Sequence, residues 1–355
     1  MRAEIKLNLT NARPDPSVAL LLGAYDFACA NKVFCMKFIT HVDESRGLEP
    51  PFGAFLSLAS YLLHHAHRSL RATTYGQLIL TNLRILVEDA QICKSLSDGD
   101  AKFSVRLCRQ RQPFLPVVIK PRPCIAHILD ILVDTINHNL RRHLDMQLYI
   151  TVFGLIHRIL SYLAFSHTRL TYHWSLLWQT MISFLRFLTT YASSFAIHDP
   201  DLPKMLKPYL DALALCVISG ELFLPDPTSY DDLFYKLVEA GENLTKFKNA
   251  FAPRISRVDD SATDGHATPT IDVLIQVSRH YQGLVQEERE KGRLGNNPSP
   301  RQISKIIRQG YESLSLPSLD GLDRWERFRE VEEKALLKRV ARLVVDDTKR
   351  LLRSG

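Results

Sequence analysis

The stretch FLPDPTSYDDLFYKLVEAG, residues 223–241, holds the end of one expected helix and the start of the next. Proline cannot continue a helix, so Pro225 and Pro227 predict the end of the preceding one. The stretch also carries three carboxylates close together, which raises the alternative of an acidic reaction centre: Asp226, Asp231 and Asp232.

The residues after the prolines favour a helix start. Ser229 and Asp232 form an S-x-x-D capping pattern, and Thr228 and Asp231 offer the same pattern one residue earlier. Aspartates in a first turn are stabilised by the positive helix end, by up to ~1 kcal/mol. Apolar residues then follow at helical spacing. We therefore predict a helix from residue 229 and find no catalytic partner for the aspartates.

Helix-period patterns of this kind dominate the 355 residues, whereas sustained two-residue alternation is absent from the sequence. Long apolar helices joined by short polar turns are typical of stacked helix pairs. The sequence therefore predicts an all-α fold, an armadillo- or HEAT-like α-solenoid of stacked antiparallel helices with a C-terminal helical extension. We expect helices near residues 17–40, 52–70, 75–97, 123–140, 144–166, 170–195, 202–219, 229–250, 270–291, 301–314 and 322–352.

Two polar breaks interrupt the helical pattern. Residues 253–270 are punctuated by Gly and Pro, which predicts a flexible loop. A second break ends in Ser-Pro-Arg-Gln, where Ser299 can cap a helix that begins at Pro300, with Gln302 completing a capping box. The expected organisation is a helical segment over 1–50, a helical repeat stack over 51–252, the loop over 253–270, and C-terminal helices of the same domain over 271–355.

Charge and hydropathy limit the classes of partner and of location. The net charge of +7 favours acidic partners, and the N-terminus has no apolar core of a signal peptide. The uncharged run between Arg169 and Arg186 is shorter than the ~20 residues of a membrane span, and Arg158 interrupts another apolar run. We expect buried helices; the alternative is an integral membrane protein with helices between 144 and 224 spanning the bilayer.

The sequence contains no motif that assembles a catalytic, cofactor or metal site, so we predict no enzyme and no catalytic, cofactor-binding or metal-binding residue. Phosphate-binding glycine loops and a nucleophile elbow are absent. His64 and His67 could share a helix face, as a zinc pair does, but no further ligand lies near them in the sequence. Cys108 lies among cations that could lower a thiol pKa, yet no histidine is adjacent.

Residues 101–129 contain no Asp or Glu but several bases. Such a block creates a positive field that could hold an acidic peptide or lipid headgroups. A solvated basic surface is an equal alternative, and sparse aromatic residues argue against nucleic acid. The candidate contact residues are Arg106, Arg109, Arg111, Lys120 and Arg122.

The last predicted helix, residues 322–352, is amphipathic. Docking on the chain's own core is the first interpretation of its apolar side. The alternative is a face for a partner or a membrane surface. The candidate face contains Trp325, Phe328, Leu336 and Val340.

Several blocks, in order, resemble one known family. TRLTYHWSLLWQTMISFLRFL, FLPDPTSYDDLFYKLVEAGE, ISKIIRQGYESLSL and GLDRWERFRE are similar to the C-terminal domain of the armadillo-like helical domain-containing protein 3 family. TNLRILVEDAQICKSL and VRLCRQRQPFLP look like its fungal members. The resemblance covers about residues 50 to 350, and residues before 50 fit less well. The chain is shorter than full-length members, which carry more helical repeats upstream.

This resemblance implies an α-solenoid adaptor of the cytosol and the peripheral Golgi membrane. Animal members are associated with maintaining Golgi phosphatidylinositol 4-phosphate by binding and recruiting the beta phosphatidylinositol 4-kinase. They are also linked to Arf-family GTPase pathways and to secretion. The family has no catalytic motif, so the resemblance implies a scaffold with protein partners and no enzymatic activity.

Overall fold

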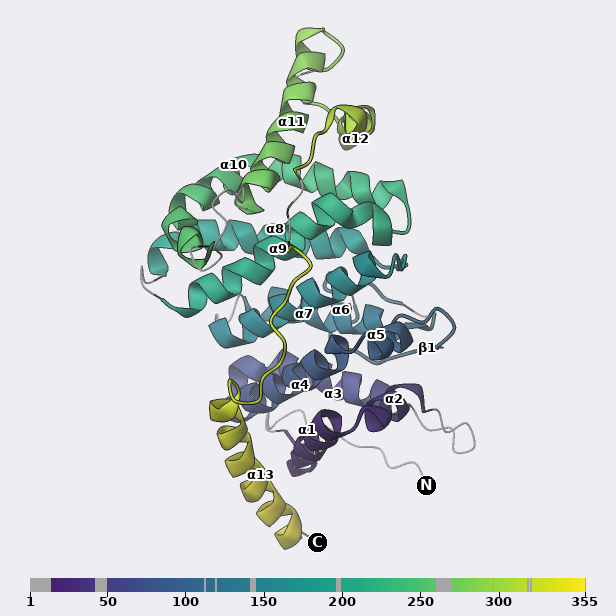
Figure 1. Cartoon of the computed structure of the whole chain (residues 1–355), viewed down its shortest axis with the longest axis vertical. Coiled ribbons are helices and arrows are strands. Elements are labelled where there is room, and N and C mark those ends of the chain that lie inside the picture. Colours follow the sequence, from purple (N-terminus) through teal and green to yellow (C-terminus); the bar gives the residue numbers. More distant parts are fainter. Residues whose placement is uncertain are drawn as a thin grey trace. The chain divides into compact units, whose positions relative to one another are not determined.

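The computed structural model describes residues 14–41, 50–111, 113–118, 120–140, 145–195, 199–259, 270–295, 297–317, 319 and 321–354. The chain divides into two compact units, and Figure 1 labels their helices. Residues 1–144 and 327–355 form unit 1, and residues 145–326 form unit 2. The contacts therefore group the C-terminal helix with the first helices, whereas the sequence analysis divided the chain at residue 252.

Unit 1 is built from helices that pack both on the next helix and on the helix three positions away along the chain. α3 contacts both α4 and α6, α1 contacts α4, and α2 contacts α5. The elements are η1 Pro16–Ala19, α1 Leu20–Ala30, α2 Lys32–Thr40, α3 Pro51–His65, η3 Ala66–Arg68, α4 Leu70–Glu88, α5 Ala90–Leu96, α6 Cys124–Asn139 and α13 Lys334–Ser354. Two two-residue strands, β1 Lys102–Phe103 and β2 Arg122–Pro123, pair antiparallel.

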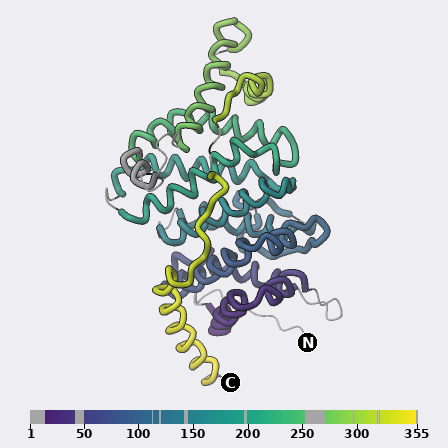
Figure 2. The backbone as a smooth tube through the Cα atoms, in the orientation of Figure 1, coloured from purple at the N-terminus to yellow at the C-terminus, as the bar shows by residue number. Residues whose placement is uncertain are grey.

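Unit 2 stacks alternate helices in two layers. α7, α9 and α11 pack one on the next, while α8 packs on α10, and α10 contacts α9, α11 and α12 (Figure 2). This arrangement confirms the predicted all-α, armadillo-like stack. The elements are α7 Met146–Phe165, α8 Trp174–Thr190, η4 Ala192–Ser194, α9 Asp201–Phe223, α10 Pro227–Asp259, α11 Thr270–Glu290, α12 Pro300–Gln309 and η5 Tyr311–Ser313.

Side-chain caps decide several helix boundaries. The capping box predicted at Ser299 and Gln302 is present, with Pro300 as the first residue of α12. Asn31 breaks the helix expected over 17–40, because its side chain accepts hydrogen bonds from the first amides of α2. Asp89 caps α5 in the same way and breaks the helix expected over 75–97. A polar residue with a cap-forming side chain therefore ends an apolar pattern that periodicity alone would continue.

The stretch around residue 225 confirms one prediction and corrects another. α9 ends at Phe223, before the two prolines. The next helix starts at Pro227, with a proline in its first turn as at α12. Asp226 caps it, since its Oδ1 accepts from the Ser229 amide at 2.9 Å. The predicted cap at Ser229 was therefore wrong.

The boundaries after residue 250 differ from the prediction. α10 continues to Asp259, into the predicted loop 253–270, whose residues 260–269 lie outside the described part. The last helix begins at Lys334, not at residue 322. Residues 324–329 have no regular secondary structure. Leu322 and Trp325 instead contact α7, as described below.

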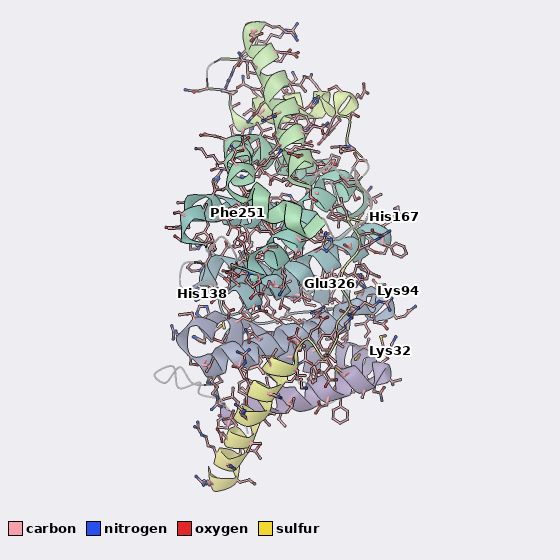
Figure 3. The ribbon with its side chains drawn as sticks, turned by 60° about the vertical axis from the view of Figure 1, so that its left-hand side comes forward. Lys32, Lys94, His138, His167, Phe251 and Glu326 are labelled. Atoms are coloured by element: carbon pink, nitrogen blue, oxygen red, sulfur yellow. The ribbon has the colours of Figure 1, made fainter. Side chains whose placement is uncertain are left out.

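Aromatic side chains fill the interior of unit 2. Phe153 of α7 lies 4.7 Å from the ring of Phe184 on α8 and 5.0 Å from that of Tyr209 on α9. All three rings are fully buried. Phe251, near the end of the described side chains of α10, is buried beside Phe247 (Figure 3). Such rings supply much of the apolar burial that stabilises helix stacks.

Among the described helices, α7 is long and apolar enough to cross a membrane, but 78% of its apolar window is buried inside the protein. Its end is fixed by His167, whose φ of 52° places it in the left-handed region that commonly terminates helices (Figure 3). The amide of Thr168 then bonds the Leu163 carbonyl at 3.0 Å. α7 is thus a core helix of unit 2.

Two phenylalanines of α7 give a matched test of this packing. We expect Phe153→Ala to lower the free energy of unfolding by about 3–5 kcal/mol, because it leaves a cavity among buried rings. Phe165 is 80% exposed at the end of the same helix, so Phe165→Ala should change stability by less than about 0.5 kcal/mol. Denaturant unfolding measures both; equal effects would contradict the core position of α7.

Candidate functional site

The segment between β1 and β2 carries the predicted basic patch and lies against α6 in unit 1. Its strands hold the two ends together, with Lys102 opposite Pro123 and Phe103 opposite Arg122. The Cys108 amide donates to the Ser60 hydroxyl on α3 at 3.0 Å. The segment is therefore attached to the helices beneath it at both ends and in the middle.

Arg122 points inward to α6. Its guanidinium lies 2.5 Å from the Asp130 carboxylate, and both side chains are almost completely buried. The same guanidinium is 3.2 Å from Nδ1 of His127, whose Nε2 donates to the Phe103 carbonyl at 3.0 Å. Burial lowers the pKa of His127, so the neutral ring can accept from Arg122 and donate to the backbone.

Arg109 also points inward. It lies 3.3 Å from the Asp134 carboxylate, and its guanidinium stacks on the ring of Phe114 at 3.5 Å. Both charged side chains are nearly buried. Burial raises the pKa of Asp134 to about 6, although Arg109 acts in the opposite direction. Arg109 thus fixes the segment rather than facing a ligand.

The predicted five-residue patch is therefore divided. Arg109 and Arg122 belong to internal ion pairs, because two carboxylates of α6 need cationic partners in a dry environment. Arg106, Arg111 and Lys120 are exposed and form no ion pair among the described residues. These three residues, which we call the exposed basic triad, are what the segment presents to solvent.

The sequence analysis missed Asp130 and Asp134. The run CIAHILDILVDTINHN places these two acids one helical turn apart within an otherwise apolar face. Acids in such a position need partners, and the acid-free block before α6 offers several bases. Two acids on an apolar helix face, together with an acid-free basic segment beside them in the sequence, therefore indicate internal ion pairs between the two.

The histidines of HHAH form a ring cluster with a fourth histidine. The His64 and His138 rings stack with centroids 4.2 Å apart, and His67 lies 5.1 Å from His138. Burial, followed by the neighbouring His138, lowers the pKa of His64 to about 3. No group of three or more His, Cys, Asp or Glu side chains in the described ranges is placed to hold a metal ion.

Asp231 and Asp232, the alternative acidic centre, occupy different environments. Asp231 is buried, and its carboxylate accepts from Arg308 of α12 and, at 2.5 Å, from the hydroxyl of Tyr311. It therefore attaches α12 and η5 to α10. Asp232 is half-buried in the first turns of α10 and has no hydrogen-bond partner in the described region. The two carboxylates therefore have no common contact in the described region.

Cys108 does not have the features of a reactive thiol. Desolvation raises the pKa of its thiol, whereas a nucleophilic cysteine needs a lowered pKa. All six cysteines are free: Cys29 and Cys108 are exposed, and the other four are buried.

The predicted partner-helix face is not one surface. Trp325 precedes α13 and lies over the Arg158 guanidinium of α7 at 3.0 Å, next to the hydrogen bond between His157 Nε2 and the Leu322 carbonyl. Phe328 packs edge-on against Tyr25, with centroids 6.3 Å apart. Leu336 and Val340 of α13 are buried within unit 1. The four residues thus contact the chain's own helices: Trp325 and Phe328 from the non-helical segment before α13, and Leu336 and Val340 from α13 itself.

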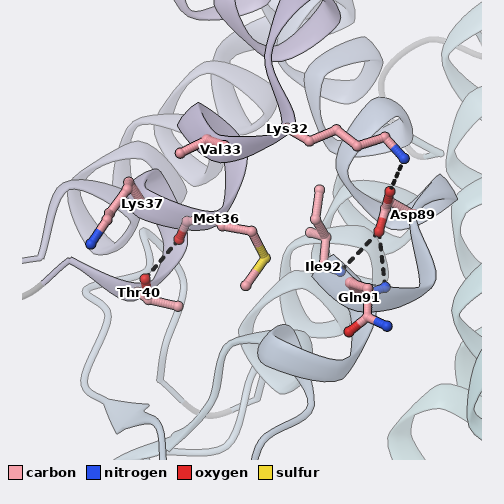
Figure 4. Close-up of a pocket in the computed structure, with 8 residues that line it drawn as sticks. All are labelled: Lys32, Val33, Met36, Lys37, Thr40, Asp89, Gln91 and Ile92. Carbon is pink, nitrogen blue, oxygen red and sulfur yellow. Dashed lines mark hydrogen bonds and ion pairs between the residues drawn. The ribbon is translucent and has the colours of Figure 1, made fainter.

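A shallow groove lies between α2 and α5 (Figure 4). Its volume is about 490 Å³, and Met36 and Ile92 contribute apolar surface to it. Lys32 and Asp89 form an ion pair of 2.6 Å at one end. The groove contains no cluster of converging ionisable groups beyond this pair among the described residues, so it offers apolar contact rather than chemistry.

Comparison with known proteins assigns this architecture to a family. The model of the family "Armadillo-like helical domain-containing protein 3, C-terminal" matches residues 122–350. The chain belongs to this family. The matched range includes every helix from α6 to α12 and most of α13, but it begins after the exposed basic triad.

Relatives in fungi and vertebrates extend the match. A UPF0588 membrane protein of Schizosaccharomyces pombe is 31% identical over 236 residues, covering 66% of this chain and 39% of the relative. Armadillo-like helical domain-containing protein 3 of Homo sapiens is 26% identical, covering 78% of this chain and 41% of the relative. That of Xenopus laevis is 25% identical, covering 82% and 42%. The chain thus spans about two fifths of the length of these relatives. No solved structure matches.

The buried pair of Arg109 and Asp134 predicts a pH-dependent stability. Because the folded state raises the pKa of Asp134 from 3.8 to about 6, it binds the proton more tightly than the unfolded state does. The stability contributed by Asp134 therefore falls as pH rises between these values. Asn at this position cannot titrate. As pH rises across this window, the free energy of unfolding of Asp134→Asn should therefore increase relative to that of the wild type, by up to roughly 3 kcal/mol. Urea unfolding of both proteins across the window tests this; a constant difference would contradict it.

The contacts of Asp231 predict a loss of attachment when the carboxylate is removed. Asp231→Ala leaves Arg308 and Tyr311 without their acceptor, so we expect a loss of about 2–3 kcal/mol and faster amide exchange in α12. Asp232→Ala is the matched control and should cost about 0.5 kcal/mol, the value of a carboxylate near a helix start. Similar exchange of α12 in both variants would refute the attachment.

Proposed function

We propose that this chain is a non-enzymatic helical scaffold at the cytosolic face of Golgi membranes. It supports phosphatidylinositol 4-phosphate maintenance and secretion by binding a phosphatidylinositol 4-kinase and components of Arf-family GTPase pathways. Membership of the armadillo-like helical domain-containing protein 3 family carries this proposal. The name of the fission-yeast relative, a membrane protein, supports a membrane location.

The structure agrees with a role in binding. Several buried carboxylates form structural contacts: Asp130 and Asp134 hold the basic segment, and Asp231 holds α12. A scaffold needs no reacting groups. It acts by raising the local concentration of a bound kinase near its lipid substrate, which increases encounters without any chemistry of its own.

The exposed basic triad is the proposed contact for an acidic surface of the partner. Its three cations form no ion pair with the residues that the structure describes, while the ion pairs of Arg109 and Arg122 keep the surrounding segment in place. A binding surface on a fixed segment loses less conformational entropy on association than one on a free loop. Because the triad is exposed, we expect it to affect mainly the rate of association with the partner and the dependence of that rate on salt.

Charge reversal tests this contact. The variant Arg106→Glu/Arg111→Glu/Lys120→Glu should bind a purified phosphatidylinositol 4-kinase at least roughly tenfold more weakly, because three attractive charges become repulsive. The matched control, Arg186→Glu/Arg279→Glu/Arg301→Glu, changes three exposed, unpaired bases of unit 2 by the same charge. Binding is measured by titration calorimetry at two salt concentrations.

Two results would contradict the proposal. Equal kinase affinity of the triad variant and the wild type would remove the triad as the contact, and failure of the wild-type chain to bind the kinase would remove the scaffold function itself. The rival interpretation, helices between 144 and 224 spanning a bilayer, predicts that the chain stays in the membrane pellet after alkaline carbonate extraction. A peripheral scaffold is released.

A further inference from the structure

The inner face of α13 attaches this helix firmly to unit 1. Asp347 is 1% exposed and lies 2.7 Å from the guanidinium of Arg71 on α4. The hydroxyl of Tyr75, on the same helix, donates to Asp347 at 2.7 Å. Leu336 and Val340 are buried on the same side of α13. The helix therefore has a defined orientation, with one face fixed against α4 and η1.

The opposite face of α13 is open and basic. Exposed residues recur at steps of three and four, which is the spacing of one helix face. Basic side chains occupy most of these positions. The outer face consists of Lys334, Lys338, Arg342, Val345, Lys349, Leu352 and Arg353.

The charge of this face is predominantly positive. None of its five bases forms an ion pair among the described residues. Of the two aspartates in the helix, Asp347 is turned inward to Arg71, and Asp346 is exposed at the edge of the outer face. An ordered helix thus presents a row of cations along one side, about 30 Å long at 1.5 Å per residue.

Two aliphatic side chains interrupt the row of cations. Val345 is 51% exposed and Leu352 is 80% exposed. The last turns of α13 also extend beyond the ends of α1 and α4 (Figures 1 and 3). A surface that only binds acidic protein groups gains little from exposed aliphatic residues between its bases. A membrane surface accepts both, since headgroups bind the cations and the acyl boundary accepts the aliphatic chains.

We propose that the outer face of α13 docks on an anionic membrane surface, with the helix lying parallel to it. This inference deepens the proposed function, because it names the surface through which the scaffold contacts the membrane. It differs from the exposed basic triad, which is proposed for the protein partner. The inner face keeps α13 on unit 1, so docking needs no detachment of the helix.

Vesicle binding tests this inference without the kinase. We expect the 355-residue chain to sediment with vesicles of phosphatidylcholine and phosphatidylserine, and much less with phosphatidylcholine alone. The variant Lys338→Glu/Arg342→Glu/Lys349→Glu should lower the partition coefficient at least roughly tenfold, since each base near an anionic surface contributes severalfold. Val345→Ser/Leu352→Ser should weaken binding by roughly three- to tenfold with no change in charge. Circular dichroism checks that each variant is folded.

The matched control is Arg106→Glu/Arg111→Glu/Lys120→Glu, which removes the same charge from the same unit and should retain vesicle binding. Loss of binding in this control but not in the α13 variant would overturn the inference. So would equal binding to neutral and anionic vesicles. A chain that binds soluble polyglutamate through α13 but not vesicles would assign the face to an acidic protein and also overturn it. Kinase affinity, measured separately, distinguishes failure here from failure of the scaffold function.

Discussion

The structure depends on enclosing helices that are apolar around most of their circumference. α7 is the extreme case: 78% of its apolar window is buried, and the ring of Phe153 contacts α8 and α9. A helix of this kind is unstable in water alone, because one exposed side would leave a large apolar area unburied. Packing alternate helices in two layers covers both sides at once. The stack therefore follows directly from the apolar composition of the helices. A single layer would leave one apolar side of each helix exposed to water.

Close packing of this kind makes every buried charge expensive unless it is paired. Asp130, Asp134, Asp231 and Asp347 are all nearly buried, and each meets a guanidinium from another element. Each pair attaches a peripheral segment to the stack: the basic segment, α12 or α13. Acidic residues that resemble catalytic groups in the sequence thus act as attachment points. Their value lies in fixing position, since removing one partner leaves an uncompensated charge.

The sequence predicts those features that arise from neighbouring residues. The stacked helices follow from apolar periodicity, and the capping box at Ser299 follows from four consecutive residues. The start of α10 was placed two residues late, because Asp226 was overlooked as a cap for a helix with proline in its first turn. The extended residues before α13 could not be predicted, since their contacts are with α7 and α4, far away in the sequence. The inward orientation of Arg109 and Arg122 has the same origin, for their partners lie on α6.

Internal pairing also determines which cations are left for partners. The net charge of +7 is not spread evenly, because many arginines are held by carboxylates. Two exposed basic surfaces on unit 1 form no ion pair with a carboxylate in the part of the chain that the structure describes: the triad in the segment against α6, and the outer face of α13. The first precedes the matched family domain, and the second lies largely within it. Because they are on different elements, the proposed contacts with an acidic protein surface and with lipid can be made at the same time. A scaffold that brings a lipid-modifying enzyme to its substrate requires two such separate surfaces.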